Sequence, residues 1–212
     1  MAPDHQADKT KHSGDSRRAI SLRRSLLIGG LGFCIVSIAI FATVAFAERW
    51  MYSHLGMPGA YLAWTILFML LGGRVFSLLA RGPNRILRFH ALFAAAFLSY
   101  AVGWVSAYFT VGGAFGEWLG SFLGSSLMAL VIAAGFGVLR SAFTLSALLF
   151  VGNSAAYFLG SRVNDSVQGS TGMLLWGAVY GLFLGAGLGA ALYVAQSQRA
   201  TRSMAETETM DV

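Results

Sequence analysis

The sequence predicts an all-α membrane protein, a bundle of about six transmembrane helices packed through ladders of glycine. Hydrophobic residues make up 56% of the 212 residues and charged residues only 11%, whereas soluble domains are about a quarter charged. Apolar runs long enough to cross a bilayer follow one another along the chain. In two of these runs glycine recurs every four residues, and small residues let transmembrane helices approach closely.

The apolar runs divide the chain into six predicted spans. They cover about residues 26–47, 60–80, 86–109, 114–139, 142–160 and 172–195. Each run is close to the roughly 20 residues that a helix needs to cross the hydrocarbon core. Residues 1–24 are basic and polar and predict a disordered cytoplasmic tail, while residues 197–212 predict a second polar cytoplasmic tail. Residues 25–196 therefore form one predicted six-helix transmembrane domain.

The first span has an alternative interpretation. Arg23 and Arg24 precede an apolar run that ends at Ala45-Phe46-Ala47, an arrangement similar to a twin-arginine signal peptide with its small-residue cleavage site. Cleavage there would leave five spans. The apolar run is about 20 residues long, however, and the hydrophobic region of a signal peptide usually has about 7 to 15. This length favours a retained transmembrane helix.

The distribution of basic residues predicts the orientation, because cytoplasmic loops retain Lys and Arg. With the N-terminus inside, the outer loops hold only Arg49 and Arg162 of the 15 basic residues. Both termini are therefore predicted to be cytoplasmic, in a multi-pass protein of the plasma membrane. The Ala-, Gly- and Arg-rich composition favours a bacterial inner membrane. The net charge is +6, and the basic residues flank the apolar spans. This placement sets the orientation of the helices, so we predict no nucleic-acid partner.

The glycine ladders predict two close helix contacts. Their members are Gly112, Gly116, Gly120 and Gly124 near the fourth span, and Gly177, Gly181, Gly185 and Gly189 in the sixth. Both spans run from outside to inside, so they could pack on each other or on a partner subunit. At Gly120 and Gly185, leucine should hold the helices apart while alanine should be milder.

The sequence contains little that could carry catalysis. Two histidines lie in the N-terminal tail, one in the first outer loop and one at the inner end of the third span, and no His-Glu-x-x-His or Walker-type motif is present. We therefore predict no catalytic residue, no metal site and no cofactor. The chain is predicted not to be an enzyme.

A few polar residues inside the spans are candidates for ligand binding, because polar groups in hydrocarbon are costly. Asn153 lies near the centre of the fifth span, with Tyr157 one turn further out; Glu117 and Ser121 lie one turn apart on the fourth span. Arg74, in the second span, could attract an anion from the inner side. An interhelical hydrogen bond is the alternative role for Asn153, and snorkelling towards the cytoplasm is the alternative for Arg74.

These features predict a non-enzymatic membrane protein that binds or transports a small solute. The alternative is an accessory or assembly subunit that docks into a larger membrane complex through its glycine-rich helices. The predicted partners are the lipid bilayer, other membrane subunits or a second copy of the chain, and a small molecule whose identity the sequence does not indicate.

Overall fold

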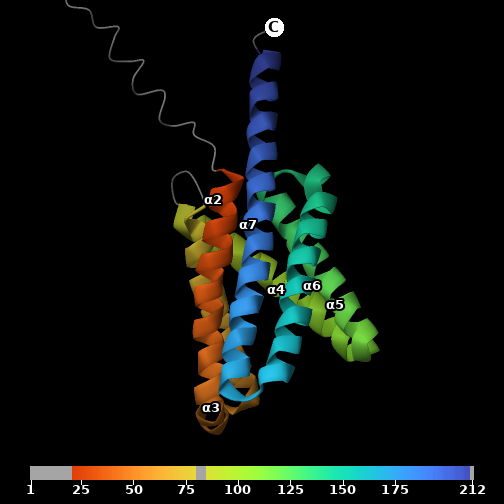
Figure 1. Ribbon diagram of the computed structural model, residues 1–212. Coiled ribbons are helices and arrows are strands. Elements are labelled where there is room, and N and C mark those ends of the chain that lie inside the picture. Colours follow the sequence, from red (N-terminus) through yellow and green to blue (C-terminus); the bar gives the residue numbers. More distant parts are fainter. Residues whose placement is uncertain (1–20, 80–84, 211–212) are drawn as a thin grey trace, which may run out of the picture.

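A computed structural model describes residues 21–79 and 85–210, and within them the chain is helical and contains no strand (Figure 1). The predicted all-α class is confirmed. Residues 1–20 of the predicted N-terminal tail lie outside the described ranges. The elements in chain order are α2 (Leu22–Leu27), the π-helical turn η1 (Ile28–Gly32), α3 (Phe33–Ser77), α4 (Arg85–Val111), α5 (Gly113–Phe136), the 3-10 turn η2 (Leu139–Ser141), α6 (Ala142–Val167) and α7 (Gly169–Met210).

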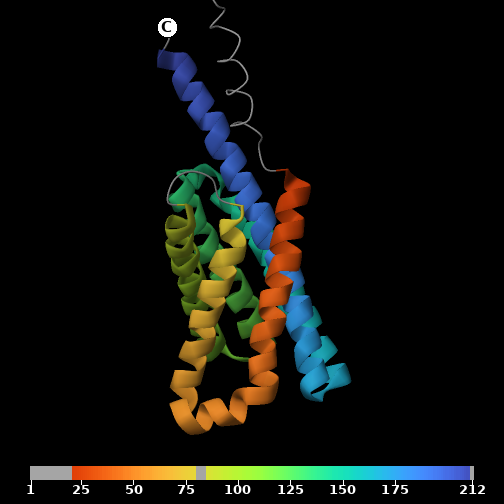
Figure 2. The same ribbon diagram turned by 90° about the vertical axis from the view of Figure 1, so that its left-hand side faces the viewer.

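Helix α3 turns back on itself at Gly56. This residue has φ 67° and ψ 170°, a backbone conformation that glycine adopts far more readily than other residues. Pro58 follows two residues later; it cannot donate a backbone hydrogen bond but suits the first turn of a new helix. The chain descends through most of residues 22–55, the first arm, crosses the end of the bundle in a short helical segment, and returns along residues 57–77, the second arm (Figure 2). Trp64 Nε1 donates to Thr43 Oγ1 across the two arms at 3.0 Å.

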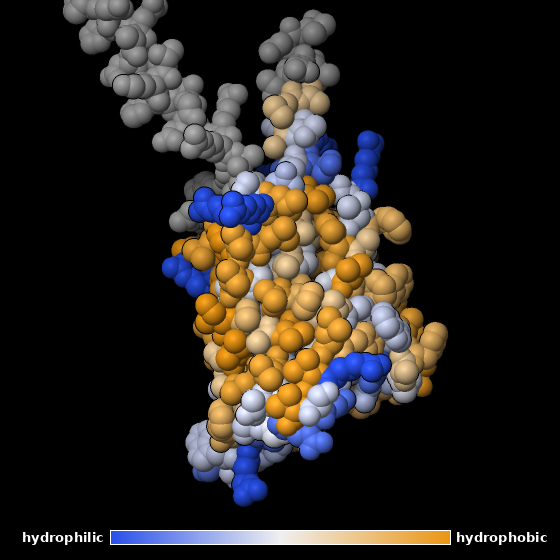
Figure 3. Space-filling model, in the orientation of Figure 1, coloured by the Kyte–Doolittle hydropathy of each residue, from blue (hydrophilic) through white to orange (hydrophobic). Residues whose placement is uncertain are grey.

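Five helices in the described ranges are long and apolar enough to cross a membrane. They are Leu22–Ser77, Ile86–Val111, Gly113–Phe136, Leu139–Val167 and Gly169–Glu206. The first of the five contains both arms, so it includes two of the six runs that the sequence predicts. Hydrophobic side chains form a broad belt around the visible face of the molecule, and hydrophilic side chains gather towards its two ends (Figure 3). This surface is the one expected of a multi-pass membrane protein.

An aromatic core joins the two arms to α4. Phe33 is fully buried on the first arm, and its ring centroid lies 5.5 Å from that of Phe76 and 6.4 Å from that of Phe93. Aromatic pairs in this range attract one another beyond the area they bury. Ile40 is also buried in this core. The first arm is therefore packed into the bundle from Phe33 to Ile40.

The glycine ladder of α7 lies along the first arm. A Cβ atom added at Gly185 would meet the carbonyl oxygen of Gly29, and one added at Gly189 would meet that of Ser25. At Gly181 it would lie 2.6 Å from the carbonyl oxygen of Phe33. The two helices run in opposite directions, so each step of four residues along α7 matches a step of four along the first arm. Backbones approach this closely only where no side chain intervenes.

The glycine ladder of α5 lies along α4 instead. An added Cβ would come within 3.0 Å of the Trp104 carbonyl oxygen at Gly120 and within 2.9 Å of the Tyr100 carbonyl oxygen at Gly124. Gly112 differs from the others: it precedes α5 with φ 70° and has no neighbour within 4 Å of its Cβ position. The two ladders therefore contact different helices of the same chain and do not pack on each other.

Helix α7 continues well beyond the bundle (Figures 1 and 2). The segment that the sequence predicts as a polar tail is helical up to Met210. Its composition favours a helix, because Ala, Arg, Glu and Met are strong helix formers. Arg202 pairs with Glu206 at 2.8 Å, one turn along the helix, and also donates to the Gly137 carbonyl oxygen at the end of α5 at 3.1 Å. This second contact ties the base of the extension to the bundle.

Candidate functional site

Helices α4, α5, α6 and α7 each contribute two polar or aromatic side chains one turn apart. The pairs are Tyr100 and Trp104 on α4, Glu117 and Ser121 on α5, Asn153 and Tyr157 on α6, and Trp176 and Tyr180 on α7. Residues four apart lie on the same face of a helix. Neighbouring helices alternate in direction, so the eight side chains form two layers. The outer layer, which is the one nearer the α4–α5 and α6–α7 turns, holds Trp104, Glu117, Tyr157 and Trp176. The inner layer, one helical turn further from those turns, holds Tyr100, Ser121, Asn153 and Tyr180.

The inner layer is a closed hydrogen-bond network centred on Asn153, which is fully buried. Tyr100 donates its hydroxyl to Asn153 Oδ1 at 2.8 Å, and Asn153 Nδ2 donates to Ser121 Oγ at 2.9 Å. Ser121 Oγ also bonds to Ser154 Oγ at 2.8 Å. Both ends of the amide thus have partners, which offsets the cost of placing it in hydrocarbon. The network links α4, α5 and α6.

The outer layer is more open, and some of its hydrogen-bond donors have no partner among the described residues. Tyr157 donates its hydroxyl to Glu117 Oε1 at 3.2 Å. Its ring contacts the indoles of Trp104 and Trp176, with centroids 5.5 and 6.3 Å away. Both indole Nε1 atoms are buried and have no hydrogen-bond partner among the described residues. Buried polar groups usually have a partner, so this layer retains two unused donors on the rings that contact Tyr157.

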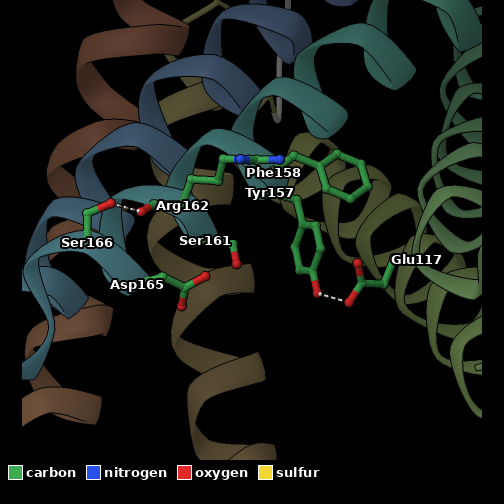
Figure 4. Close-up of a pocket in the computed structure, with 7 residues that line it drawn as sticks. All are labelled: Glu117, Tyr157, Phe158, Ser161, Arg162, Asp165 and Ser166. Atoms are coloured by element: carbon green, nitrogen blue, oxygen red, sulfur yellow. Dashed lines mark hydrogen bonds between the residues drawn. The ribbon is translucent and has the colours of Figure 1, made fainter. Parts of the chain in front are cut away.

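A pocket of about 360 Å³ opens from the outer layer between α5 and α6 (Figure 4). Its lining is Glu117, Tyr157, Phe158, Ser161, Arg162, Asp165 and Ser166. The first four are partly buried and the last three are exposed, so the pocket has an inner end at Glu117 and a mouth at Arg162 and Asp165. This volume lies within the range of small-molecule sites.

The structure brings together four of the five residues predicted as ligand-binding, in two separate pairs. Glu117 and Tyr157 contact each other and line the pocket. Asn153 and Ser121 contact each other in the closed network and are not among the lining residues, so these contacts support the hydrogen-bonding role for Asn153. Arg74 is separate from all four: it is exposed on the second arm, and only its carbonyl oxygen has a described contact, accepting from Ser77.

Several residues of the two layers were missed by sequence reasoning. Tyr100, Trp104, Trp176 and Tyr180 look like ordinary aromatic residues of apolar spans. A usable signal was present, because in four successive spans a pair of polar or aromatic residues recurs at a spacing of four. The predicted spans end at residue 160 and begin again at residue 172, so the sequence predicts that the pocket residues Ser161, Asp165 and Ser166 lie in an outer loop. In the structure α6 continues to Val167 and places them on a helix.

Metal binding finds no support in the residues described. Within residues 21–79 and 85–210, no three His, Cys, Asp or Glu side chains come together in a way that could hold a metal ion. Comparison with known proteins adds no assignment: no protein-family model, no curated protein and no solved structure matches the chain. The described residues are helical, fit a multi-pass membrane protein by the length and composition of their helices, and form a polar pocket at one end of the bundle.

Proposed function

We propose that this protein is a non-enzymatic membrane component that binds a small solute in the pocket between α5 and α6. The observation that carries the proposal is the meeting of Glu117 and Tyr157 at the inner end of a 360 Å³ pocket. A carboxylate in a membrane bundle is costly and is often functional. Among the described residues Glu117 forms no ion pair, so its charge is available to a ligand.

The topology that we propose has six spans, with both termini cytoplasmic and the pocket on the outer side. The turn at Gly56 and the contact between Trp64 and Thr43 support two crossings by the arms of α3. Removal of the first arm would expose Gly185 and Gly189, so we infer that this arm is retained after synthesis. The excess of Lys and Arg in the segments assigned to the inside supports the orientation.

This topology predicts the side on which each label reacts. A cysteine placed at Leu55, which is exposed beside the Gly56 turn, should react with an impermeant maleimide on intact cells. Cys34 is partly buried and its thiol faces the Ala178 carbonyl oxygen at 3.4 Å, so the parent protein should stay unlabelled. Reporters fused to the N- and C-termini should both report the cytoplasm. Termini on opposite sides would contradict the six-span topology.

A role as an accessory subunit remains the second candidate, favoured by the extension of α7. Residues 198–206 of this helix are exposed and project from the end of the bundle that we assign to the cytoplasm. Docking through the glycine ladders is less favoured. Apart from Gly112, the predicted ladder glycines lie against helices of the same chain, which leaves no continuous glycine face for a partner.

Substitution of Glu117 tests the binding function. We expect Glu117→Gln to weaken solute binding about tenfold, equivalent to about 1.4 kcal/mol, because the amide keeps the shape and loses the charge. Binding would be measured by tryptophan fluorescence and calorimetry on protein in nanodiscs, with a broad panel of amines, amino acids, organic acids and sugars. Glu48→Gln, an exposed carboxylate at the end of the first arm, is the matched control.

The same experiment separates the two candidates. A solute that binds the parent protein and Glu48→Gln equally, but binds Glu117→Gln more weakly, supports the binding role. If nothing in the panel binds and a membrane protein co-purifies only when residues 198–210 are present, the accessory role is the correct one.

A further inference from the structure

We infer that the solute bound in this pocket is a zwitterion, with an ammonium group and an anionic group such as a carboxylate a few bonds apart. The inference rests on the proposed binding function and names the class of its ligand. It derives from charges of both signs that line one pocket without pairing with each other. The pocket holds the carboxylates of Glu117 and Asp165 and the guanidinium of Arg162.

The opposite charges of the pocket remain separate. Arg162 and Asp165 lie three residues apart on α6, a spacing that allows an ion pair, yet they form none. Within the described ranges the one ion pair joins Arg202 to Glu206, far from the pocket. In Figure 4 the Arg162 side chain extends towards Phe158 and away from Asp165, and the carboxylates of Asp165 and Glu117 lie on different sides of the pocket. All three charged groups are therefore free to contact a ligand.

The inner end of the pocket suits an ammonium group. Glu117 uses one carboxylate oxygen to accept from Tyr157, and its second oxygen has no described partner. The aromatic rings of Tyr157 and Phe158 line the same end, and aromatic faces attract cations. Ser161 adds a hydroxyl that can accept a hydrogen bond from a primary ammonium. A positive group here would face negative charge and π electrons on several sides.

The mouth of the pocket suits the anionic end of the same molecule. Arg162 and Asp165 are both exposed there, and in Figure 4 their side chains leave α6 in different directions. The guanidinium can therefore hold a carboxylate with two parallel hydrogen bonds on the side away from Asp165. A purely cationic solute would leave this guanidinium unpaired, and a purely anionic one would be repelled by Glu117 and Asp165. A solute that carries both charges satisfies both ends. A volume of about 360 Å³ accommodates such a molecule.

The test compares probes of similar size and shape that differ in their charged groups, on the full chain in nanodiscs. Glycine betaine is the zwitterion, choline lacks the carboxylate, and 3,3-dimethylbutanoate replaces the ammonium by an uncharged carbon. The second set, γ-aminobutyrate, butylamine and butyrate, makes the same comparison for a primary ammonium. We expect the zwitterion of at least one set to bind at least tenfold more tightly than both of its partners.

Two variants assign the charges to their ends. Arg162→Gln should weaken zwitterion binding about tenfold and leave cation binding unchanged or stronger, whereas Glu117→Gln should weaken both. Arg49→Gln, the other basic residue of the predicted outer loops, is the matched control and should change neither. The melting temperature of each variant confirms that it is folded.

Failure of this inference is distinguishable from failure of the proposed function. If choline or butylamine binds as tightly as its zwitterion and Arg162→Gln has no effect, the pocket binds solutes but the ligand is a simple cation. If neither zwitterion binds, the inference is overturned, and the broad solute panel with Glu117→Gln decides independently whether the pocket binds anything else.

Discussion

Alanine at Gly185 or Gly29 is expected to destabilise the bundle severely, although it adds only one methyl group to the glycine. The Cβ of either alanine would meet the backbone carbonyl of the other position across the contact between α7 and the first arm. A backbone atom cannot rotate away as a side chain can, so the two helices must separate. Overpacking of this kind costs about 1–3 kcal/mol or more, and separation along the helix would affect the neighbouring contacts at Gly181 and Gly189.

The adjacent residue provides the control. Gly30 lies beside Gly29, but its added Cβ would come no closer than 3.4 Å to Leu182. Gly30→Ala should therefore be neutral or stabilising, by up to about 1 kcal/mol from its better helix propensity. The measurement is the melting temperature and the monodisperse yield in mild detergent. Equal stability of Gly29→Ala, Gly185→Ala and Gly30→Ala would show that this ladder does not hold the helices together.

The glycines of the two ladders differ in how closely a neighbouring backbone approaches them. At Gly120 the nearest atom to an added Cβ is the Trp104 carbonyl oxygen at 3.0 Å, and at Gly116 it is the Ala107 carbonyl oxygen at 3.4 Å. We therefore expect alanine to be tolerated at Gly116, mildly destabilising at Gly120 and severe at Gly185. The sequence predicts only that alanine is milder than leucine at both Gly120 and Gly185, because spacing alone does not reveal how closely two backbones approach.

Replacement of Asn153 by leucine is expected to lower stability without changing the affinity of the remaining folded protein for its ligand. The change removes the acceptor of Tyr100 and the donor to Ser121, so two buried hydrogen bonds are lost. A hydrogen bond of this kind contributes about 0.5–1.5 kcal/mol. The pocket is lined by Tyr157 and Glu117 and not by Asn153, so the affinity should be preserved.

A double-mutant cycle tests the mechanism of this loss. Tyr100→Phe removes the same hydrogen bond from the other side, so adding it to Asn153→Leu should cause no further loss of stability. Asn164→Leu, an amide on the same helix outside the network, serves as the control. A variant Asn153→Leu that keeps the parent melting temperature but no longer binds solute would place Asn153 in the binding site and contradict the hydrogen-bonding role.

The sequence predicts Glu117 and Tyr157 as site residues but not the other residues that line their pocket. Each of these two residues is an isolated polar group in an apolar run. Counting helical turns from the predicted ends of the spans places both at a similar depth in the membrane. Residues 161–166 look like a polar loop, because Ser, Arg, Asn and Asp there end the hydrophobic pattern. The tertiary structure extends α6 through this segment to Val167. The mouth of the pocket is therefore helical and has a defined arrangement of charges.

What the sequence determined by itself was the class of the protein and the position of its helices. Hydrocarbon leaves every backbone polar group without water, so a long apolar run in a membrane becomes a helix whatever its neighbours are. The same reasoning places polar residues at the ends of the spans and predicts that a central amide such as Asn153 faces protein. These are local consequences of composition and length, and they need no knowledge of which helices touch.

Only the tertiary structure decided the pairing of the helices and the roles of their polar groups. Glycine spacing predicts a close contact but not its partner, and the partners proved to be the first arm for α7 and α4 for α5. Asn153 forms a closed network because α4 brings Tyr100 to it. Glu117 lines a pocket because, among the described residues, Tyr157 is the one side chain that bonds to its carboxylate. In an apolar solvent many helix pairings bury similar surface, so side-chain fit and hydrogen bonding select among them.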